Sequence, residues 1–80
     1  MTSTVRCAII GTGGIANAHS RAIQALAPRT EAVAAVDIDR ERVEAFCQRH
    51  GIPRAYTDSA EMLATERPDL VHICTPPRVH

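Results

Sequence analysis

The chain has 80 residues, nine basic and nine acidic side chains, a formal net charge of zero and 2% aromatic residues. This length allows at most one small domain, and the balanced charge argues against a nucleic-acid or membrane-surface partner. No apolar stretch reaches the roughly 18 residues of a membrane span. With one Phe and one Tyr, the core must be aliphatic.

The first half of the chain alternates apolar runs with helical spacing. Residues 5–10 are almost continuously apolar, which predicts a strand covered on both faces. A helix follows and ends before Pro28. Spacings of three and four predict a buried helix face of Ile15, His19, Ala22, Ile23 and Leu26. Residues 32–36 form a second apolar run, which is closed by Asp37.

The second half repeats this alternation. Asp39 is the expected N-cap of a second helix, which Gly51 ends in a left-handed C-cap. Its predicted buried stripe consists of Val43, Phe46, Cys47 and His50. A short extended segment over residues 55–57 precedes a capping box at residues 58–61. The third helix is expected to reach about residue 67, and the last strand covers residues 70–75.

The order of these elements is β-α-β-α-β-α-β, without repeats or a low-complexity linker. Strands that alternate with helices predict right-handed crossovers and a parallel sheet. The predicted fold class is therefore α/β, a Rossmann-like doubly wound parallel sheet with strand order 3-2-1-4. A ligand is expected beyond the carboxyl ends of strands 1 and 4, where the strand order reverses.

The turn after the first strand reads "GTGGIA", residues 11–16. Gly11 would allow a sharp exit from the strand, and Gly13 would let the backbone approach a pyrophosphate at the helix N-terminus. Gly14 adds a further small residue at the helix start. Ala16 occupies the position where the helix packs on the strand, and the dinucleotide fingerprint admits Gly or Ala there. A ligand-free turn is the simpler alternative, but the strand-turn-helix context favours dinucleotide binding.

An acid at the end of the second strand supports that interpretation. Asp37 lies 21 residues after Ala16, where a carboxylate can accept both ribose hydroxyls of an adenosine. Its charge would repel a 2′-phosphate, which favours NAD over NADP. Arg40 could stack on adenine or neutralise a 2′-phosphate, but an ordinary surface charge of the helix is the simpler interpretation. A methyltransferase-like domain that binds S-adenosylmethionine remains an alternative, because it also joins a Gly-rich turn to an acid after strand 2.

The three cysteines, Cys7, Cys47 and Cys74, have no CxxC spacing and are expected to be small buried thiols rather than metal ligands. The N-terminus "MTSTV" lacks the basic segment of a signal peptide. Both features predict a cytoplasmic, reducing location.

Four segments carry a resemblance to a known family: "GTGGIANAH", "AAVDIDRERVEAF", "YTDSAEML" and "PDLVHICTPPRVH". Together they resemble the N-terminal NAD(P)-binding domain of the Gfo/Idh/MocA oxidoreductases over residues 5–80. The resemblance implies NAD(P)-dependent hydride transfer at a carbon that bears a hydroxyl, on a sugar, inositol or related polyol. It also implies a homo-oligomeric parent protein.

The resemblance assigns cofactor-binding roles residue by residue. The pyrophosphate loop corresponds to Gly11, Gly13, Gly14 and Ile15, and the adenosine end to Asp37 and Arg40. The segment that borders the nicotinamide ribose corresponds to Thr75, Pro76 and His80. Pro77 stands where the family often has Asn, so one hydrogen bond to the cofactor is lost there.

No catalytic residue is expected within the chain. The family's acid/base chemistry uses a lysine, and all nine basic residues here are Arg. His19 and His72 are assigned packing roles, and His50 is expected to be a cation at a helix C-terminus. Residues 1–80 are therefore expected to be the N-terminal part of a dinucleotide-binding Rossmann domain, a fragment whose substrate domain lies elsewhere. A stand-alone nucleotide-binding module without catalysis is the remaining alternative.

Overall fold

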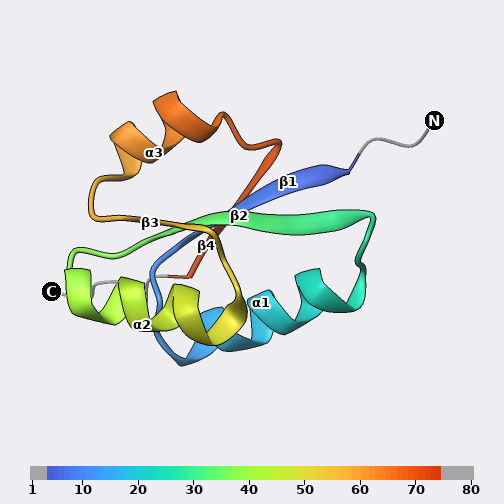
Figure 1. Ribbon diagram of the computed structural model, residues 1–80, viewed down its shortest axis with the longest axis horizontal. Coiled ribbons are helices and arrows are strands. Elements are labelled where there is room, and N and C mark those ends of the chain that lie inside the picture. Colours follow the sequence, from blue (N-terminus) through green and yellow to red (C-terminus); the bar gives the residue numbers. More distant parts are fainter. Residues whose placement is uncertain (1–3, 75–80) are drawn as a thin grey trace, which may run out of the picture.

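The computed structural model describes residues 4–74, in which strands and helices alternate (Figure 1). The elements in chain order are β1 (Val5–Ile10), α1 (Gly14–Ala25), β2 (Thr30–Val36), α2 (Arg40–His50), β3 (Arg54–Tyr56), α3 (Ser59–Glu66) and β4 (Leu70–Ile73). The alternation predicted from the sequence is confirmed. Among these residues, no helix has the length and apolar character needed to cross a membrane.

All strand pairs are parallel, and the sheet order is β3-β2-β1-β4. The predicted order 3-2-1-4 is therefore confirmed. The register aligns Ile10 with Val36 on one side and with Ile73 on the other, so three strands end at the same level. The turns that follow β1, β2 and β4 consequently meet at one edge of the sheet. β4 forms an outer edge, where Leu70 and Ile73 are half or more exposed.

Two apolar layers cover the two faces of the sheet. Figure 1 shows α1 and α2 on one face and α3 on the other. The larger cluster joins α1 and α2 to the sheet through residues that include Ile9, Val43 and Phe46. The smaller cluster lies beneath α3, where Met62 is completely buried. Helices on both faces explain why β1 and β2 are almost continuously apolar.

The helix caps follow the sequence closely. Asp39 Oδ1 accepts a hydrogen bond of 3.2 Å from the Arg42 amide at the start of α2. Asp58 Oδ1 accepts one of 2.9 Å from the Ala60 amide at the start of α3. Gly51 ends α2 with a φ of 68°, a left-handed conformation that glycine adopts without steric cost. The predicted caps are therefore confirmed. They were predictable because each cap involves groups only a few residues apart in the sequence.

The predicted buried face of α1 is partly wrong. Ala22 and Leu26 are exposed, and the residues that face the sheet are Ala16, Ser20 and Ile23. Ala16 and Ser20 are both fully buried, so the small side chains lie against the sheet. Hydrophobicity alone overlooked Ser20, whose hydroxyl is buried without a hydrogen-bond partner in the described part of the chain.

Strand boundaries shift by one or two residues from the predicted ones. β2 begins at Thr30 rather than at residue 32, because Thr30 pairs with Val5 of β1. β3 covers Arg54–Tyr56 rather than residues 55–57, and β4 ends at Ile73. Such end effects depend on partner strands and are invisible in local sequence patterns.

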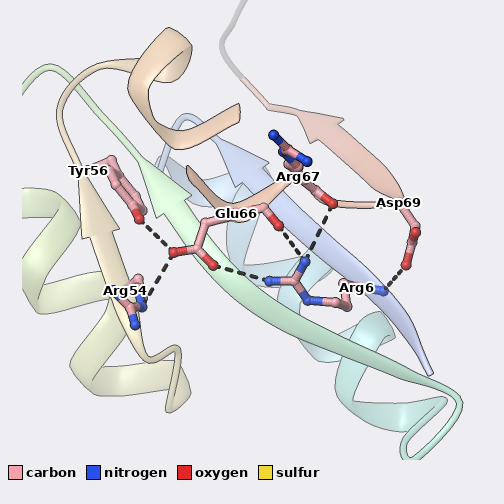
Figure 2. Close-up of polar contacts among 6 residues, drawn as sticks. All are labelled: Arg6, Arg54, Tyr56, Glu66, Arg67 and Asp69. Atoms are coloured by element: carbon pink, nitrogen blue, oxygen red, sulfur yellow. Dashed lines mark hydrogen bonds and ion pairs between the residues drawn. The ribbon is translucent and has the colours of Figure 1, made fainter. Parts of the chain in front are cut away.

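A polar network ties the end of α3 to the sheet (Figure 2). The carboxylate of Glu66, only 8% exposed, lies 3.2 Å from Arg6 Nη2 on β1 and 3.4 Å from Arg54 Nε on β3. It also accepts a 2.5 Å hydrogen bond from the Tyr56 hydroxyl. Arg6 Nη1 in addition donates to the backbone carbonyls of Glu66, the last residue of α3, and of Arg67, its C-cap. The Arg6 side chain therefore satisfies carbonyls that the helix end leaves free.

Candidate functional site

A cavity of about 580 Å³ lies at the edge where the parallel strands end. Its walls come from the turn after β1, the loop after β2, the segment after β3 and the end of β4. The lining residues are Ile10, Gly11, Thr12, Gly13, Val36, Asp37, Ile38, Arg42, Thr57, Ser59 and Cys74. The cavity includes the predicted location beyond the ends of β1 and β4, and it extends further to the ends of β2 and β3.

The glycine turn forms one wall of this cavity. Gly11 has a φ of 92°, which other residues rarely adopt, and its amide donates to the Val36 carbonyl at 2.7 Å. Gly13 is the N-cap of α1, and no side chain caps this helix. No atom lies within 4 Å of the position that a Cβ would take at Gly13 or Gly14. The positive end of α1 is therefore open to an anion such as a pyrophosphate.

Ala16 lies on the opposite side of the same helix turn. It is completely buried within the core cluster that joins α1 to the sheet. The predicted packing role of Ala16 is confirmed. The backbone of Ile15 lies in the first turn of α1, next to the glycines.

Asp37 faces the glycine turn from the end of β2. Its Oδ2 atom accepts hydrogen bonds from the Thr12 amide at 3.1 Å and from the Thr12 hydroxyl at 2.7 Å. Its Oδ1 atom accepts a 3.0 Å bond from the Asp39 amide. Burial raises the pKa of Asp37, but these three bonds and the charge of Arg42 outweigh it and lower the pKa below the usual value. The carboxylate is therefore ionised at neutral pH.

The two arginines at the start of α2 lie differently. Arg40 forms an exposed ion pair of 3.5 Å with Glu44 and does not belong to the cavity lining. Arg42 lines the cavity, and its positive charge acts on Asp37. Residues two apart on a helix point in nearly opposite directions, so only one of them can face the site. A role of Arg40 at the adenosine end stays a prediction.

Several lining residues were not selected from the sequence. Thr12 is 7% exposed and bonds to Asp37, yet the fingerprint treats its position as variable. Ile38 is 90% exposed, an unusual state for a large aliphatic side chain. The sequence signal that could have indicated its exposure is its position between two aspartates, Asp37 and Asp39. Thr57, Ser59 and Cys74 come from the ends of neighbouring elements, and only the sheet order brings them here.

The predicted residues Thr75, Pro76 and His80 lie outside the described part of the chain. The rings of His19 on α1 and His72 on β4 lie 5.1 Å apart, in agreement with a packing role. Burial, and next the charge of His19, lower the pKa of His72. Within residues 4–74, no group of three or more side chains is arranged to hold a metal ion.

His50 was expected to be a cation at the end of α2. Its Nε2 atom instead lies 2.7 Å from Asn17 Oδ1, across the contact between α1 and α2. Burial, together with the charges of Arg49 and Arg21, lowers the pKa of His50, so the neutral ring predominates at neutral pH. His50 also borders a second cavity of about 400 Å³, which is formed by the ends of α1 and α2. That cavity shares no residue with the first one.

Comparison with known proteins agrees with this geometry. Residues 5–80 match the profile of a family described as "Oxidoreductase family, NAD-binding Rossmann fold". The chain belongs to the Gfo/Idh/MocA family. The predicted fold, family and NAD cofactor are thereby confirmed at the level of this family. The S-adenosylmethionine alternative is not favoured, because the family is one of oxidoreductases.

Three relatives illustrate the similarity within the Gfo/Idh/MocA family. D-Glucoside 3-dehydrogenase of Escherichia coli K12 is 30% identical over 79 residues, which are 99% of this chain and 22% of the relative. D-Apiose dehydrogenase of Paraburkholderia graminis is 41% identical over 68 residues, 85% of this chain and 18% of the relative. The WlbA dehydrogenase of Chromobacterium violaceum, solved with NADH and UDP-GlcNAcA, is 35% identical with a TM-score of 0.86. That superposition covers 95% of this chain and 22% of WlbA. The chain thus spans about a fifth of the length of the relatives it matches.

Proposed function

We propose that the chain is the cofactor-holding part of an enzyme that transfers a hydride between NAD and a sugar, an inositol or a related polyol. The observation that carries this proposal is the open N-terminus of α1, which faces the same cavity as the ionised Asp37. The first feature suits a pyrophosphate, and the second suits the hydroxyls of a ribose. A ribose joined to a pyrophosphate is the part of an adenosine diphosphate group that these two features would bind.

The nicotinamide supplies the hydride chemistry when the cofactor is bound, and the chain's own residues bind and orient the cofactor. The backbone of Gly13 and Gly14 receives the pyrophosphate, because no side chain blocks its approach. The exposed Ile38 offers an apolar surface on which the adenine can rest. Thr75, Pro76 and His80 remain proposed neighbours of the nicotinamide ribose.

The proposed substrate class rests on the relatives. D-Glucoside 3-dehydrogenase and D-apiose dehydrogenase are sugar dehydrogenases by name, and a myo-inositol 2-dehydrogenase from Lactobacillus plantarum is 30% identical with a TM-score of 0.80. We assign the substrate-binding domain and the proton-transferring groups to sequence beyond this chain, because the chain covers 22% of such relatives. An assay of the whole enzyme that contains this chain, with NAD and a panel of inositols, aldoses and glucosides, tests the proposed substrate class. Reduction of NAD by none of them would contradict it.

The preference for NAD over NADP is proposed from the charge at Asp37. A carboxylate repels a 2′-phosphate and accepts hydrogen bonds from a free diol. The test compares Asp37→Asn with Asp58→Asn, a control in which the helix cap is preserved because Asn caps as well as Asp. We expect NADH to bind Asp37→Asn about tenfold more weakly, with NADPH affected less. Equal NADH affinity in both variants would contradict the role of Asp37.

We further propose a cytoplasmic location. The three cysteines Cys7, Cys47 and Cys74 are all buried and unpaired, as is usual in a reducing compartment. Assembly into a homo-oligomer stays a prediction, which analytical ultracentrifugation of the protein can check.

A further inference from the structure

The hydrogen bonds of Asp37 leave its carboxylate almost fully occupied. A carboxylate offers about four acceptor positions, two on each oxygen. Oδ2 uses two of them for the amide and the hydroxyl of Thr12, and Oδ1 uses one for the Asp39 amide. One acceptor position, on Oδ1, is left for a ligand. A ribose diol has two hydroxyl donors, so the carboxylate alone cannot accept both while these bonds persist.

The Thr12 hydroxyl supplies the missing acceptor. A hydroxyl has one proton to donate and two lone pairs with which to accept. Its proton is directed at Asp37 Oδ2 over 2.7 Å, and no group within residues 4–74 donates to its oxygen. Thr12 and Asp37 line the same cavity. The ionised carboxylate of Asp37 therefore orients the Thr12 hydroxyl: its proton points to Asp37, and its lone pairs can accept a hydrogen bond from a ligand.

We propose that Thr12 and Asp37 act as one receptor for the vicinal diol of the cofactor's adenosine ribose, with Thr12 as a specificity-determining binding residue. One ribose hydroxyl donates to Asp37 Oδ1 and the other to Thr12 Oγ1. This inference rests on the proposed function, and it assigns to the variable position of the glycine turn a part in choosing between NAD and NADP.

The same arrangement disfavours a 2′-phosphate for two reasons. A phosphate at neutral pH needs hydrogen-bond donors, and both groups of the pair present only acceptors to the ligand. The negative charge of Asp37 adds repulsion. Arg42 from α2 is the cation that acts on Asp37, whereas Thr12, Thr57 and Ser59 from the other walls carry no charge. Asp39 is the nearest acid in sequence, and its carboxylate caps α2 through the Arg42 amide.

Two substitutions at one position separate this role from packing. Thr12→Val keeps the shape of the side chain and removes the hydroxyl, whereas Thr12→Ser keeps the hydroxyl and removes a methyl group. NADH and NADPH affinities are measured by calorimetry on the wild-type protein and both variants, with thermal midpoints recorded to verify folding. We expect Thr12→Val to bind NADH about tenfold more weakly while NADPH changes less, and Thr12→Ser to stay within about threefold of wild type.

The pH profile of NADH binding provides a second readout. The Thr12 hydroxyl is one of the groups that lower the pKa of Asp37, so its removal raises this pKa. Thr12→Val should therefore lose NADH affinity at a higher pH than wild type when the solution is acidified. An unchanged midpoint would show that the Thr12 hydroxyl does not act on Asp37, so that the two residues would not form one receptor.

The outcomes distinguish this inference from the proposed function. If the wild-type protein does not bind NADH, the proposed function is wrong and the inference fails with it. If the wild type binds NADH and Asp37→Asn weakens binding, but Thr12→Val matches wild type in affinity and pH profile, only the inference is overturned. Equal losses of NADH and NADPH affinity in Thr12→Val, without recovery in Thr12→Ser, would also overturn it.

Discussion

The substitution Glu66→Gln tests how far one buried carboxylate stabilises this small domain. Glu66 is 8% exposed and holds Arg6, Arg54 and Tyr56 from two different strands (Figure 2). Glutamine has nearly the same shape, but it is neutral and replaces one acceptor oxygen with an NH₂ donor. The substitution therefore removes both ion pairs and turns a donor toward an arginine, with little change in packing.

The magnitude follows from the exposure of the partners. The side chains of Arg6 and Arg54 are 38% and 64% exposed, so water can solvate them when the carboxylate charge is lost. Each ion pair then contributes at most about 1 kcal/mol, well below the value for a fully buried pair. Arg6 also retains its bonds to the backbone carbonyls at the end of α3. We expect a total loss of about 1–2 kcal/mol, equivalent to roughly 4–16 °C in Tm for a domain of this size.

The assay is thermal and urea unfolding of the protein at pH 7, followed by circular dichroism. Glu44→Gln is the matched control, because Glu44 is 58% exposed and pairs only with Arg40 on the surface of α2. That control should lose less than about 0.5 kcal/mol. NADH affinity should be unchanged in Glu66→Gln, because neither Glu66 nor any of its three partners lines the cavity. If Glu66→Gln has the same thermal and urea midpoints as Glu44→Gln, the network contributes no more than a surface ion pair and our reasoning is refuted.

Three further predictions concern the glycine turn, a helix end and a buried thiol. Gly13→Ala should cost no more than about 1 kcal/mol of unfolding free energy, because the added methyl meets no atom within 4 Å although alanine is a poorer N-cap than glycine. It should nevertheless weaken NADH binding about tenfold or more. Unchanged NADH affinity would show that the pyrophosphate does not approach this residue. Gly51→Ala should cost about 1 kcal/mol of unfolding free energy, because alanine is strained at a φ of 68°; a Tm equal to that of wild type would argue against this strain. Burial raises the pKa of Cys47 to about 11 from the usual 9.0, so at pH 8 its thiolate is about 100-fold scarcer than in a free cysteine. Iodoacetamide labelling, followed by mass spectrometry, should find Cys47 unreacted in the folded protein at pH 8. Cys47 should react only as the pH rises toward 11 or after the protein unfolds. Labelling at the rate of free cysteine would contradict the raised pKa.

Most of the secondary structure was predictable because it depends on neighbours in the sequence. The caps Asp39, Asp58 and Gly51 bond within a few residues of themselves, so their residue types are sufficient to place the helix ends. The face of α1 was harder to predict, because a helix that packs closely on a sheet buries small residues such as Ser20 and leaves Leu26 in solvent. The spacing of hydrophobic residues does not indicate how closely α1 approaches the sheet.

In the candidate site, too, some features were predictable from the sequence and others required the packed structure. The glycine turn and Asp37 were recognisable, because a strand, a turn and a helix in sequence place them at one edge of a parallel sheet. The choice between Arg40 and Arg42 required the rotation of α2 about its axis, which depends on how Val43 and Phe46 pack beneath it. The bond between Thr12 and Asp37 joins residues 25 positions apart, and no local pattern encodes it.

The sequence by itself determined the order of elements and the position of the glycine turn, because periodicity, caps and glycine conformation are local properties. The alternation of strands and helices indicated the strand order, and four motifs indicated the family. The tertiary structure alone decided which donors occupy Asp37, which arginine faces the cavity and how Glu66 is shared by Arg6 and Arg54. These depend on side-chain directions across elements, which become defined only when the sheet and its two helical layers pack together.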